Sequence, residues 1–233
     1  MRIDLVTGIA GARAAHGIVV VIDVLRSFTV SAYALAGGAR ECRLVTTVDE
    51  ARALAAKTQN AVLSVEVDGL PVPGIAISNS PTMVHATDLT DRILVQRSSA
   101  GTPVAAAAQS DDIFAASLVV ARATVQACLL RRPQTLTLVA SGDFPEDHAC
   151  ARYMEAIAKD HEPDIDQLLR PLRESDRYRK FAAGEWPGFP PSDLDLALTP
   201  DRFDFAMPVR REHGYLRVTA VPARFGGTEP SSL

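Results

Sequence analysis

The sequence predicts an α/β protein: a mostly parallel sheet with helices on both faces. Short runs of aliphatic and β-branched residues alternate along the chain with longer segments whose apolar residues recur at helical spacing. Several runs, such as IVVVIDV over 18–24, are apolar at consecutive positions, which is typical of strands covered on both faces. Regular alternation of such strands with helices is the pattern of a parallel sheet with crossover helices.

Six strands and five helices are expected before residue 161. The strands are short apolar runs bounded by polar or turn residues, at 18–24, 42–48, 61–67, 92–96, 112–117 and 135–141. The helices carry apolar residues on one face or are rich in alanine, at 27–39, 49–59, 101–109, 119–132 and 145–160. Ser27 is a candidate N-cap, and Pro133 is expected to end the helix before it.

The amino-acid composition of the chain changes near residue 160. We expect residues 1–160 to form the main α/β domain, which carries the site, and residues 161–233 to pack on the same core as a smaller α+β part. Residues 161–200 are charged and rich in proline, which indicates helical segments and a surface loop. Residues 203–222 suit an antiparallel pair of strands turning near His213 and Gly214, and the last residues, GGTEPSSL, are expected to fray.

Composition narrows the class of protein. A chain of 233 residues that is 47% apolar can bury a sizeable core. With 24 basic and 28 acidic residues and no long basic stretch, nucleic acid is not an expected partner. Cys42, Cys128 and Cys150 lie far apart, which favours reduced thiols over a zinc site or disulfides. Neither a signal peptide nor a membrane span is evident, so a cytoplasmic protein without a membrane partner is expected.

Polar and charged residues follow the ends of the predicted strands. In a parallel sheet, ligands bind beyond the carboxyl ends of the strands, so these residues are expected to share one edge. They are Asp23 and Arg26, Glu66, then Arg97, Ser98, Ser99, Gly101 and Thr102, and finally Glu146 and Asp147. Carboxylates suit Mg²⁺, a loop before a helix suits an anion, and arginines pair with phosphate or carboxylate oxygens. The set favours phosphate chemistry with a divalent cation.

Each of these residues also has a simple structural explanation. Asp23 and Ser27 could cap the following helix, and Glu146 and Asp147 fall in a first helical turn, where acids are stabilised by the helix dipole. Arg97 could be an ordinary surface partner of an acid. The argument for a site therefore depends on the whole set.

Several common catalytic motifs are missing. The sequence has no GxGxxG after a strand, no GxxxxGK[ST] and no GxSxG, which argues against a dinucleotide site, a P-loop and a nucleophile elbow. VVVIDVLRS has a strand ending in an aspartate, as in haloacid-dehalogenase-type phosphatases. However, the second acid of that motif, the general acid, is replaced by Leu25.

Taken in order, the segments resemble the 2-phosphosulfolactate phosphatase family. The family's V-x-D-V-x-R-A-[ST]-T motif stands here as VIDVLRSFT, residues 21–29, and its N-S-P block lies within VEVDGLPVPGIAISNSPTMV, residues 65–84. The [ST]-x-x-G-T loop stands as RSSAGT, residues 97–102, and the E-D-x-x-[CA]-A motif lies within SGDFPEDHACA, residues 141–151. DLDLALTPDRFDFAMPV, residues 193–209, is also similar, so the resemblance covers most of the chain.

The resemblance implies a fold of the family's own type and Mg²⁺-dependent hydrolysis of a phosphate monoester. The implied substrate is 2-phospho-3-sulfolactate, which gives 3-sulfolactate and phosphate on the route to coenzyme M. The implied site residues, carried over by matching position, are Asp23, Arg26, Glu66, Asn79, Ser80, Gly101, Thr102, Glu146 and Asp147. One departure bears on the substrate: Ala100 stands where the family's loop has an asparagine.

These residues lead to a working mechanism. Asp23, Glu66, Glu146 and Asp147 are expected to hold Mg²⁺, and Arg26 and residues 98–102 to stabilise the transferring phosphoryl group. Asp147 or Asp23 would orient or deprotonate the water, Asn79 and Ser80 would contact substrate, and Arg97 would hold its carboxylate or sulfonate. Attack by water and an aspartyl-phosphate on Asp23 both stay open.

Three functions are compatible with this set. They are a phosphatase acting on phosphosulfolactate, a phosphatase of the same fold acting on another small anionic ester, and a binder of an anionic metabolite without catalysis. The four acids of this set argue against a binder without catalysis, because the binding of an anion does not require carboxylates. A homodimer is the default expectation for such an enzyme.

Overall fold

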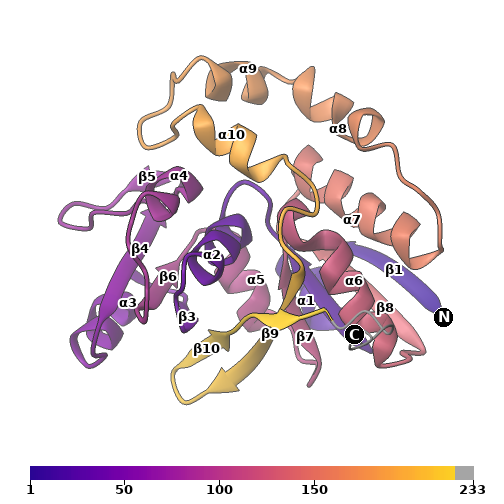
Figure 1. The fold of residues 1–233 in the computed structure, drawn as a ribbon, viewed down its shortest axis with the longest axis horizontal. Coiled ribbons are helices and arrows are strands. Elements are labelled where there is room, and N and C mark those ends of the chain that lie inside the picture. The colour runs from indigo at the N-terminus through magenta and orange to yellow at the C-terminus, as the bar shows by residue number, and fades with distance from the viewer. Residues whose placement is uncertain (224–233) are drawn as a thin grey trace, which may run out of the picture.

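One curved sheet organises the chain, and the computed structural model describes residues 1–223 of it (Figure 1). Within those residues the sheet has eleven strands. Four parallel strands form a first block, in the order β1 (Arg2–Thr7), β8 (Thr135–Ala140), β2 (Ile18–Ile22) and β7 (Ile113–Ala116). Three parallel strands form a second block, in the order β3 (Glu41–Val45), β6 (Ile93–Arg97) and β4 (Ala61–Val67). The predicted α/β class is confirmed.

An antiparallel hairpin joins the two blocks. Its strands are β9 (Phe205–Glu212), which pairs with β7, and β10 (Tyr215–Val218), which pairs with β3. The short strands β5 (Leu70–Pro71) and β11 (Val221–Pro222) pair with β4 and β9. The predicted antiparallel pair near the C-terminus is therefore confirmed. Its position between the two blocks of the sheet could not be predicted from the sequence.

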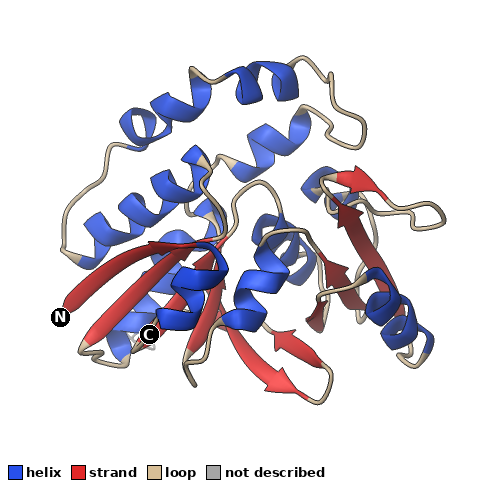
Figure 2. Cartoon of the chain, turned by 180° about the vertical axis from the view of Figure 1, so that it is seen from behind, coloured by secondary structure: helices blue, strands red, loops and turns tan. Residues whose placement is uncertain are grey.

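The hairpin changes how the two blocks face each other. Three successive antiparallel pairings separate β7 from β3, so along the hydrogen-bonded path the blocks run in opposite directions. In space the blocks lie on either side of α2 (Ser27–Ala36) and α5 (Gly101–Ala107), with the hairpin between them (Figures 1 and 2). The carboxyl ends of β2 and β6 still meet, because Gly101 lies against Asp23. Curvature of the sheet, which the sequence does not reveal, brings the predicted strand ends together.

Helices cover both faces of the first block. Strand β2 alternates between two cores: Val19 and Val21 enter one, and Ile18, Val20 and Ile22 enter the other. The first core packs against α1 (Gly8–Ala14), α2, α4 (Pro81–His85) and α5, and the second against α6 (Ala121–Leu130), α7 (Pro145–Ala158) and α8 (Ile165–Arg173). Two-sided burial explains the apolar run at 18–22.

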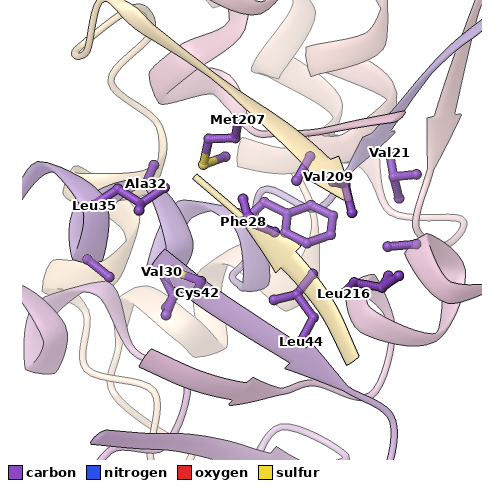
Figure 3. Close-up of a cluster of buried hydrophobic side chains, with 14 of the residues drawn as sticks. Val21, Phe28, Val30, Ala32, Leu35, Cys42, Leu44, Met207, Val209 and Leu216 are labelled. Atoms are coloured by element: carbon purple, nitrogen blue, oxygen red, sulfur yellow. The ribbon is translucent and has the colours of Figure 1, made fainter. Parts of the chain in front are cut away.

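The first core fixes α2 beside the hairpin. Phe28, fully buried near the start of α2, lies among Met207, Val209 and Leu216 of the hairpin strands (Figure 3). Burying a phenylalanine side chain contributes about 1.5–3 kcal/mol. The packing holds the first turn of α2, and with it the segment that follows β2, in place.

The second block and the C-terminal segment complete the architecture. Helix α3 (Val48–Ala56) covers the second block, and its Thr47 and Glu50 form a reciprocal capping box. The segment predicted to wrap the surface contains α8, α9 (Asp176–Ala182) and α10 (Ser192–Ala197), which arch over the strand ends (Figure 1). The expected fraying of GGTEPSSL falls outside the described residues.

Several predicted boundaries differ from the structure. The strand expected over 18–24 ends at Ile22, so Asp23 already lies beyond the sheet. Ser27 is not the N-cap of α2: Arg26 occupies that position, and the Asp23 carboxylate accepts the hydrogen bond from the Ser27 N–H at 2.9 Å. The helix expected from residue 119 begins as a 3-10 turn at Leu118–Val120 before α6.

Strand β1 and helix α1 were not predicted at all. Residues of β1 are exposed or half-buried, as at an edge strand, so the run lacks the apolar signature of its neighbours. Helix α1 contains Gly8 and Gly11 and has no acid in its first turn, which weakens its helical signal.

Two general expectations can be compared with the structure. Cys42, Cys128 and Cys150 are buried free thiols, as predicted. Within residues 1–223, every helix is too short or too polar to cross a membrane.

Candidate functional site

A cavity of about 340 Å³ opens at the convergent strand ends. Such a volume is at the lower end of pockets that hold small molecules. Residues from the ends of β2, β4 and β6 form one side, and residues near α7 and from the C-terminal segment form the other. The lining residues are Asp23, Leu25, Arg26, Glu66, Asp68, Gly69, Asn79, Ser98, Ser99, Ala100, Phe144, Arg177 and Phe189.

Asp23 is a buried acid in the wall of this cavity. It directly follows β2, is only 4% exposed, and its Oδ1 accepts the Ser27 N–H. Burial raises the pKa of the Asp23 carboxyl to about 6, and the negative charges of Glu66 and Glu146 act in the same direction. Backbone hydrogen bonds from Ser27 and Gly101 oppose the shift without cancelling it. Asp23 is therefore a carboxylate that takes up a proton close to neutral pH.

Glu66 ties together two loops that line the cavity. One carboxylate oxygen, Oε1, accepts the Ser99 N–H, and the other, Oε2, accepts the Gly69 N–H and the Ser99 hydroxyl at 3.1 Å. The Ser99 hydroxyl in turn accepts the Asp68 N–H at 2.7 Å. Both oxygens of Glu66 thus hold protein groups, and this fixes the loops after β4 and β6 relative to each other.

The loop at 98–102 uses most of its amide groups internally. The Ser98 N–H donates to the Thr102 hydroxyl at 3.1 Å, and the Thr102 N–H donates to the Ser98 hydroxyl at 3.0 Å. Ser99 donates to Glu66, and Gly101 to Asp23. Of the five amides, Ala100 alone has no acceptor among residues 1–223. The loop therefore presents fewer free N–H groups to an anion than the sequence suggested.

Gly101 is required by close packing. A Cβ atom at this position would lie 2.6 Å from the Asp23 Oδ2 and 2.9 Å from the Ser27 Cβ. Only glycine lets the start of α5 approach the acid this closely. The family-like glycine is thus explained by its contact with Asp23.

Arg26 is buried and held by protein groups. Its Nη1 donates to Asp193 Oδ2 at 2.8 Å and to the Gly188 carbonyl at 2.6 Å, and its guanidinium carbon lies 3.8 Å from the centre of the Phe189 ring. Burial lowers the pKa of Arg26, and the ion pair with Asp193 opposes that shift. Although Arg26 lines the cavity, these contacts commit its charge to α10.

Asn79 and Ser80 lie close together in the chain but have different surroundings. Asn79 lines the cavity, and its Oδ1 accepts a hydrogen bond from Gln96 at 2.9 Å. Ser80 is the N-cap of α4 and donates its hydroxyl to Asp193 at 2.7 Å, outside the cavity lining. The structure therefore brings Asn79 to the site and places Ser80 in a supporting network.

Arg97 points away from the cavity. Its guanidinium donates to the backbone carbonyls of Thr46 and Glu66 and to the Ser99 hydroxyl at 3.1 Å. Arg97 is not among the lining residues. It braces the ends of β3 and β4, and Thr102 and Gly101 likewise lie behind the lining rather than in it.

Asp147 and Glu146 begin α7 and are both buried. Asp147 accepts the Val24 N–H at 2.8 Å with one oxygen, and the Ser141 N–H and hydroxyl with the other, so it joins the ends of β2 and β8. Burial, with the charges of Asp23 and Glu146, raises the pKa of Asp147 well above its usual range. Neither acid is among the residues that line the cavity.

Glu146 has a free oxygen and an arginine partner. Its Oε1 accepts Arg177 Nη2 at 2.9 Å, while its Oε2 is buried with no hydrogen-bond partner within the described chain. Burial raises the pKa of Glu146, and the charge of Arg177 opposes the shift. An unpartnered buried carboxylate oxygen suits a cation or an ordered water.

The four acids expected to form one metal site are not assembled as a cage. Across residues 1–223, no group of three His, Cys, Asp or Glu side chains is placed to hold a metal ion. Glu66 and Asp147 use their oxygens on protein N–H and O–H groups, whereas Asp23 and Glu146 retain capacity for another ligand. The structure thus separates the acids that organise the site from those that could bind a cation.

Several lining residues were missed by sequence reasoning. Arg177 and Phe189 come from the segment after residue 160, and Phe144 precedes α7. Arg177 stacks over Phe144, 4.6 Å from the ring centre. The sequence around these residues does not indicate a binding site. Phe189, for example, lies in EWPGFPPSD, which reads as a surface loop. Residues on both sides of the expected boundary at 160 line the cavity; the boundary itself stays a prediction.

The sequence is similar to sequences of known proteins. The family model described as 2-phosphosulpholactate phosphatase matches residues 5–170. A "probable 2-phosphosulfolactate phosphatase" of Bacillus subtilis is 32% identical over 200 residues, covering 83% of this chain and 87% of its own. A protein of the same name from Thermoplasma acidophilum is 28% identical over 186 residues, covering 78% and 81%. The chain belongs to the 2-phosphosulfolactate phosphatase family.

Proposed function

We propose that this protein hydrolyses a small anionic phosphate monoester, with 2-phospho-3-sulfolactate as the first candidate. The observation that carries the proposal is Asp23: a buried acid in the wall of a small cavity, at the end of the central strand β2, with a pKa of about 6. The names of the related proteins support the substrate class.

Asp23 is the proposed catalytic carboxylate, as a general base or as a nucleophile. Its Oδ1 is oriented by the Ser27 N–H, and its Oδ2 lies toward Gly101. In direct attack, the Asp23 carboxylate would orient the attacking water and accept its proton. An aspartyl-phosphate on the same carboxylate is the second route that the geometry allows.

We propose Mg²⁺ as the cofactor, held by Asp23 and Glu146. The unpartnered Glu146 Oε2 supports this, because Mg²⁺ is usually bound by one or two carboxylates, several waters and substrate phosphate rather than by a protein cage. When bound, Mg²⁺ would neutralise charge on the phosphoryl oxygens and lower the pKa of a bound water. Glu66 and Asp147 are proposed to position the surrounding loops and strand ends.

The remaining lining residues have proposed roles in binding. The Ala100 N–H, the Ser98 and Ser99 region and Asn79 would contact the ester. Arg26, which is paired with Asp193, would act mainly through its positive charge, since its donors already have acceptors. Gly101 and Thr102 would support the loop from behind.

The test is phosphate release from 2-phosphosulfolactate and a panel of other phosphate esters, with Mg²⁺ and after EDTA treatment. Asp23→Asn is compared with Asp91→Asn, an exposed aspartate in a turn. The proposal expects Mg²⁺-dependent release that Asp23→Asn abolishes and Asp91→Asn retains. If no ester releases phosphate from the wild type, the proposed activity is wrong. The stereochemistry at phosphorus separates the two routes: with an ester made chiral at phosphorus by oxygen isotopes, inversion supports direct attack by water, and retention supports an aspartyl-phosphate on Asp23, because that route needs two in-line displacements.

One observation favours a substrate other than 2-phosphosulfolactate. Ala100, which replaces the family's asparagine, lines the cavity. If another member of the ester panel is preferred, Ala100→Asn should move the preference toward 2-phosphosulfolactate. Measured ratios of kcat/KM between the two esters decide this.

A further inference from the structure

The cavity has two arginines in its lining, and they differ in how far protein groups occupy their terminal nitrogens. Arg26 is 2% exposed in its side chain and has acceptors for both terminal nitrogens among Asp193 and the carbonyls of Gly188, Gly69 and Ser78. Arg177 uses one hydrogen bond, from Nη2 to Glu146. A guanidinium carries five N–H donors, so most of those on Arg177 remain available.

Arg177 is also accessible from the cavity. Its side chain is 29% exposed, and Phe144 supports one face of the guanidinium. Its Nη1 donates to no acceptor within residues 1–223, whereas its Nε is buried there without a partner. A guanidinium that is supported on one face and has free Nη1 donors is well suited to bind a carboxylate or sulfonate.

The opposite part of the lining is acidic. Asp23, Glu66 and Asp68 line the cavity, and the amides of the 98–102 loop are largely occupied. An ester that carries a carboxylate or sulfonate besides its phosphoryl group needs a partner for that group as well. Mg²⁺ near Asp23 would serve the phosphoryl group, and both terminal nitrogens of Arg26 already have protein acceptors, so Arg177 is the lining arginine with a terminal nitrogen free for a non-reacting anionic group.

The separation of the two groups is small. Asp23 and Arg177 line the same cavity, and Glu146, the ion-pair partner of Arg177, is close enough for its charge to act on Asp23. The cavity volume of about 340 Å³ also limits the ligand to a small molecule. A short carbon chain could therefore reach from the acid end to the arginine.

We propose that Arg177 is the specificity-determining residue that binds the second, non-reacting anionic group of the substrate, a carboxylate or sulfonate on a short carbon chain. The proposal rests on the proposed function and deepens it. It moves to α9 a role that the sequence suggested for Arg97. Since the family match ends at residue 170, Arg177 lies outside the matched region.

The experiment compares three phosphate esters that differ in this second group. 2-Phosphosulfolactate carries a carboxylate and a sulfonate, 2-phospholactate carries a carboxylate, and glycerol 2-phosphate carries neither. KM and kcat are measured with Mg²⁺ for the wild type, Arg177→Gln and Arg177→Lys. Arg179→Gln is the matched control, because Arg179 lies on the same helix, is exposed and pairs with Asp176. Ratios between esters within one variant do not depend on the folded fraction.

The proposal expects Arg177→Gln to raise KM for the first two esters by about tenfold to a hundredfold, the range for losing charge-assisted hydrogen bonds. KM for glycerol 2-phosphate should change by less than about threefold, Arg177→Lys should recover part of the loss, and Arg179→Gln should match the wild type. Equal loss on all three esters, or no change, would show that Arg177 only neutralises Glu146, and would overturn the inference alone.

Binding of the product keeps the inference separate from the activity. 3-Sulfolactate lacks the phosphoryl group, and its affinity for the wild type and Arg177→Gln can be measured by calorimetry without turnover. Loss of binding in Arg177→Gln supports the assignment even if no ester is hydrolysed. If the wild type does not bind 3-sulfolactate, or both proteins bind it equally, the assignment is wrong.

Discussion

Arg26 and Asp193 lie 167 positions apart in the chain and form a fully buried ion pair, with Nη1 2.8 Å from Oδ2. The pair joins the segment after β2 to helix α10, and Asp193 also accepts the Ser80 hydroxyl and the Thr82 N–H. One carboxylate thus links the strand end that carries Asp23, the start of α4, and the C-terminal segment.

Asp193→Asn should destabilise the protein by about 3–5 kcal/mol, because it leaves the Arg26 charge buried without its partner. The free energy of unfolding, measured in urea, tests this. Asp195→Asn, on the exposed side of the same helix, should change it by less than about 0.5 kcal/mol. If the two variants unfold at the same urea concentration, the pair does not contribute as described.

Asp23→Asn should remove the activity and should also remove the loss of stability that the wild type shows as pH rises. The folded-state pKa of Asp23, about 6, lies above the ordinary value of 3.8, so the folded protein binds this proton more tightly than the unfolded chain. The wild type therefore loses stability as pH rises from about 4 to 6. The variant, which carries no charge at this position, avoids a loss on the order of 1–3 kcal/mol above pH 7.

Urea unfolding of both proteins between pH 4 and pH 8 measures this difference. The stability of Asp23→Asn relative to the wild type should rise by about 1–3 kcal/mol between pH 4 and pH 8. The amide nitrogen of the variant cannot accept a hydrogen bond at any pH, so only the change with pH reports the charge. A stability difference that does not depend on pH would contradict the assignment of a destabilising buried charge.

Gly101→Ala should impair activity, because its Cβ would stand 2.6 Å from the Asp23 Oδ2. Displacing a reactive group by about 1 Å can cost on the order of a hundredfold in rate, and crowding of this kind costs about 1–3 kcal/mol of stability. Gly11→Ala is the control: its Cβ would be similarly tight, 3.0 Å from the Val6 Cβ, but far along the chain and outside the cavity. Gly11→Ala should retain kcat. If both variants lose kcat, the loss in Gly101→Ala comes from crowding in general and not from displacement of Asp23.

Glu66→Gln should loosen both loops that its carboxylate holds. The amide nitrogen of glutamine cannot accept a hydrogen bond, so the N–H of Ser99 or of Gly69 loses its acceptor. The expected destabilisation is about 1.5–3 kcal/mol, measured by urea unfolding, with a parallel fall in phosphatase activity. Asp68→Asn, an exposed neighbour in the same turn, should unfold like the wild type. Normal stability of Glu66→Gln would show that the loops are held by other contacts.

The sequence revealed strands buried on both faces more readily than other elements. Strand β8, buried from Leu136 to Ala140, was predicted over 135–141, within one residue of its observed bounds, whereas β1, half-exposed at the edge, carries charges at Arg2 and Asp4 and was missed. Periodicity reports burial, and an edge strand has little of it.

The candidate site was predictable in its acids and less so in its arginines. Asp23 directly follows an apolar strand and Glu66 lies near the end of another, so parallel topology alone predicts that they approach a common edge. Arg97 is the last residue of its strand, yet its side chain donates to the carbonyls of Thr46 and Glu66. Side-chain direction and long-range partners, such as Arg177 for Glu146, depend on tertiary packing that one sequence does not display.

The cavity is lined by two parts of the chain that the fold holds in place in different ways. The acid end belongs to strand termini that the packing of the whole sheet holds fixed, whereas Arg177 and Phe189 come from a surface helix and a loop that reach this end through side-chain contacts with Glu146 and Arg26. Substitutions in residues 176–190 can therefore alter which ester is accepted, and a substitution of Arg177 also changes the surroundings of Glu146. A fragment ending at residue 170 would keep the acid end yet lose one wall of the binding pocket, so it would not be a minimal enzyme.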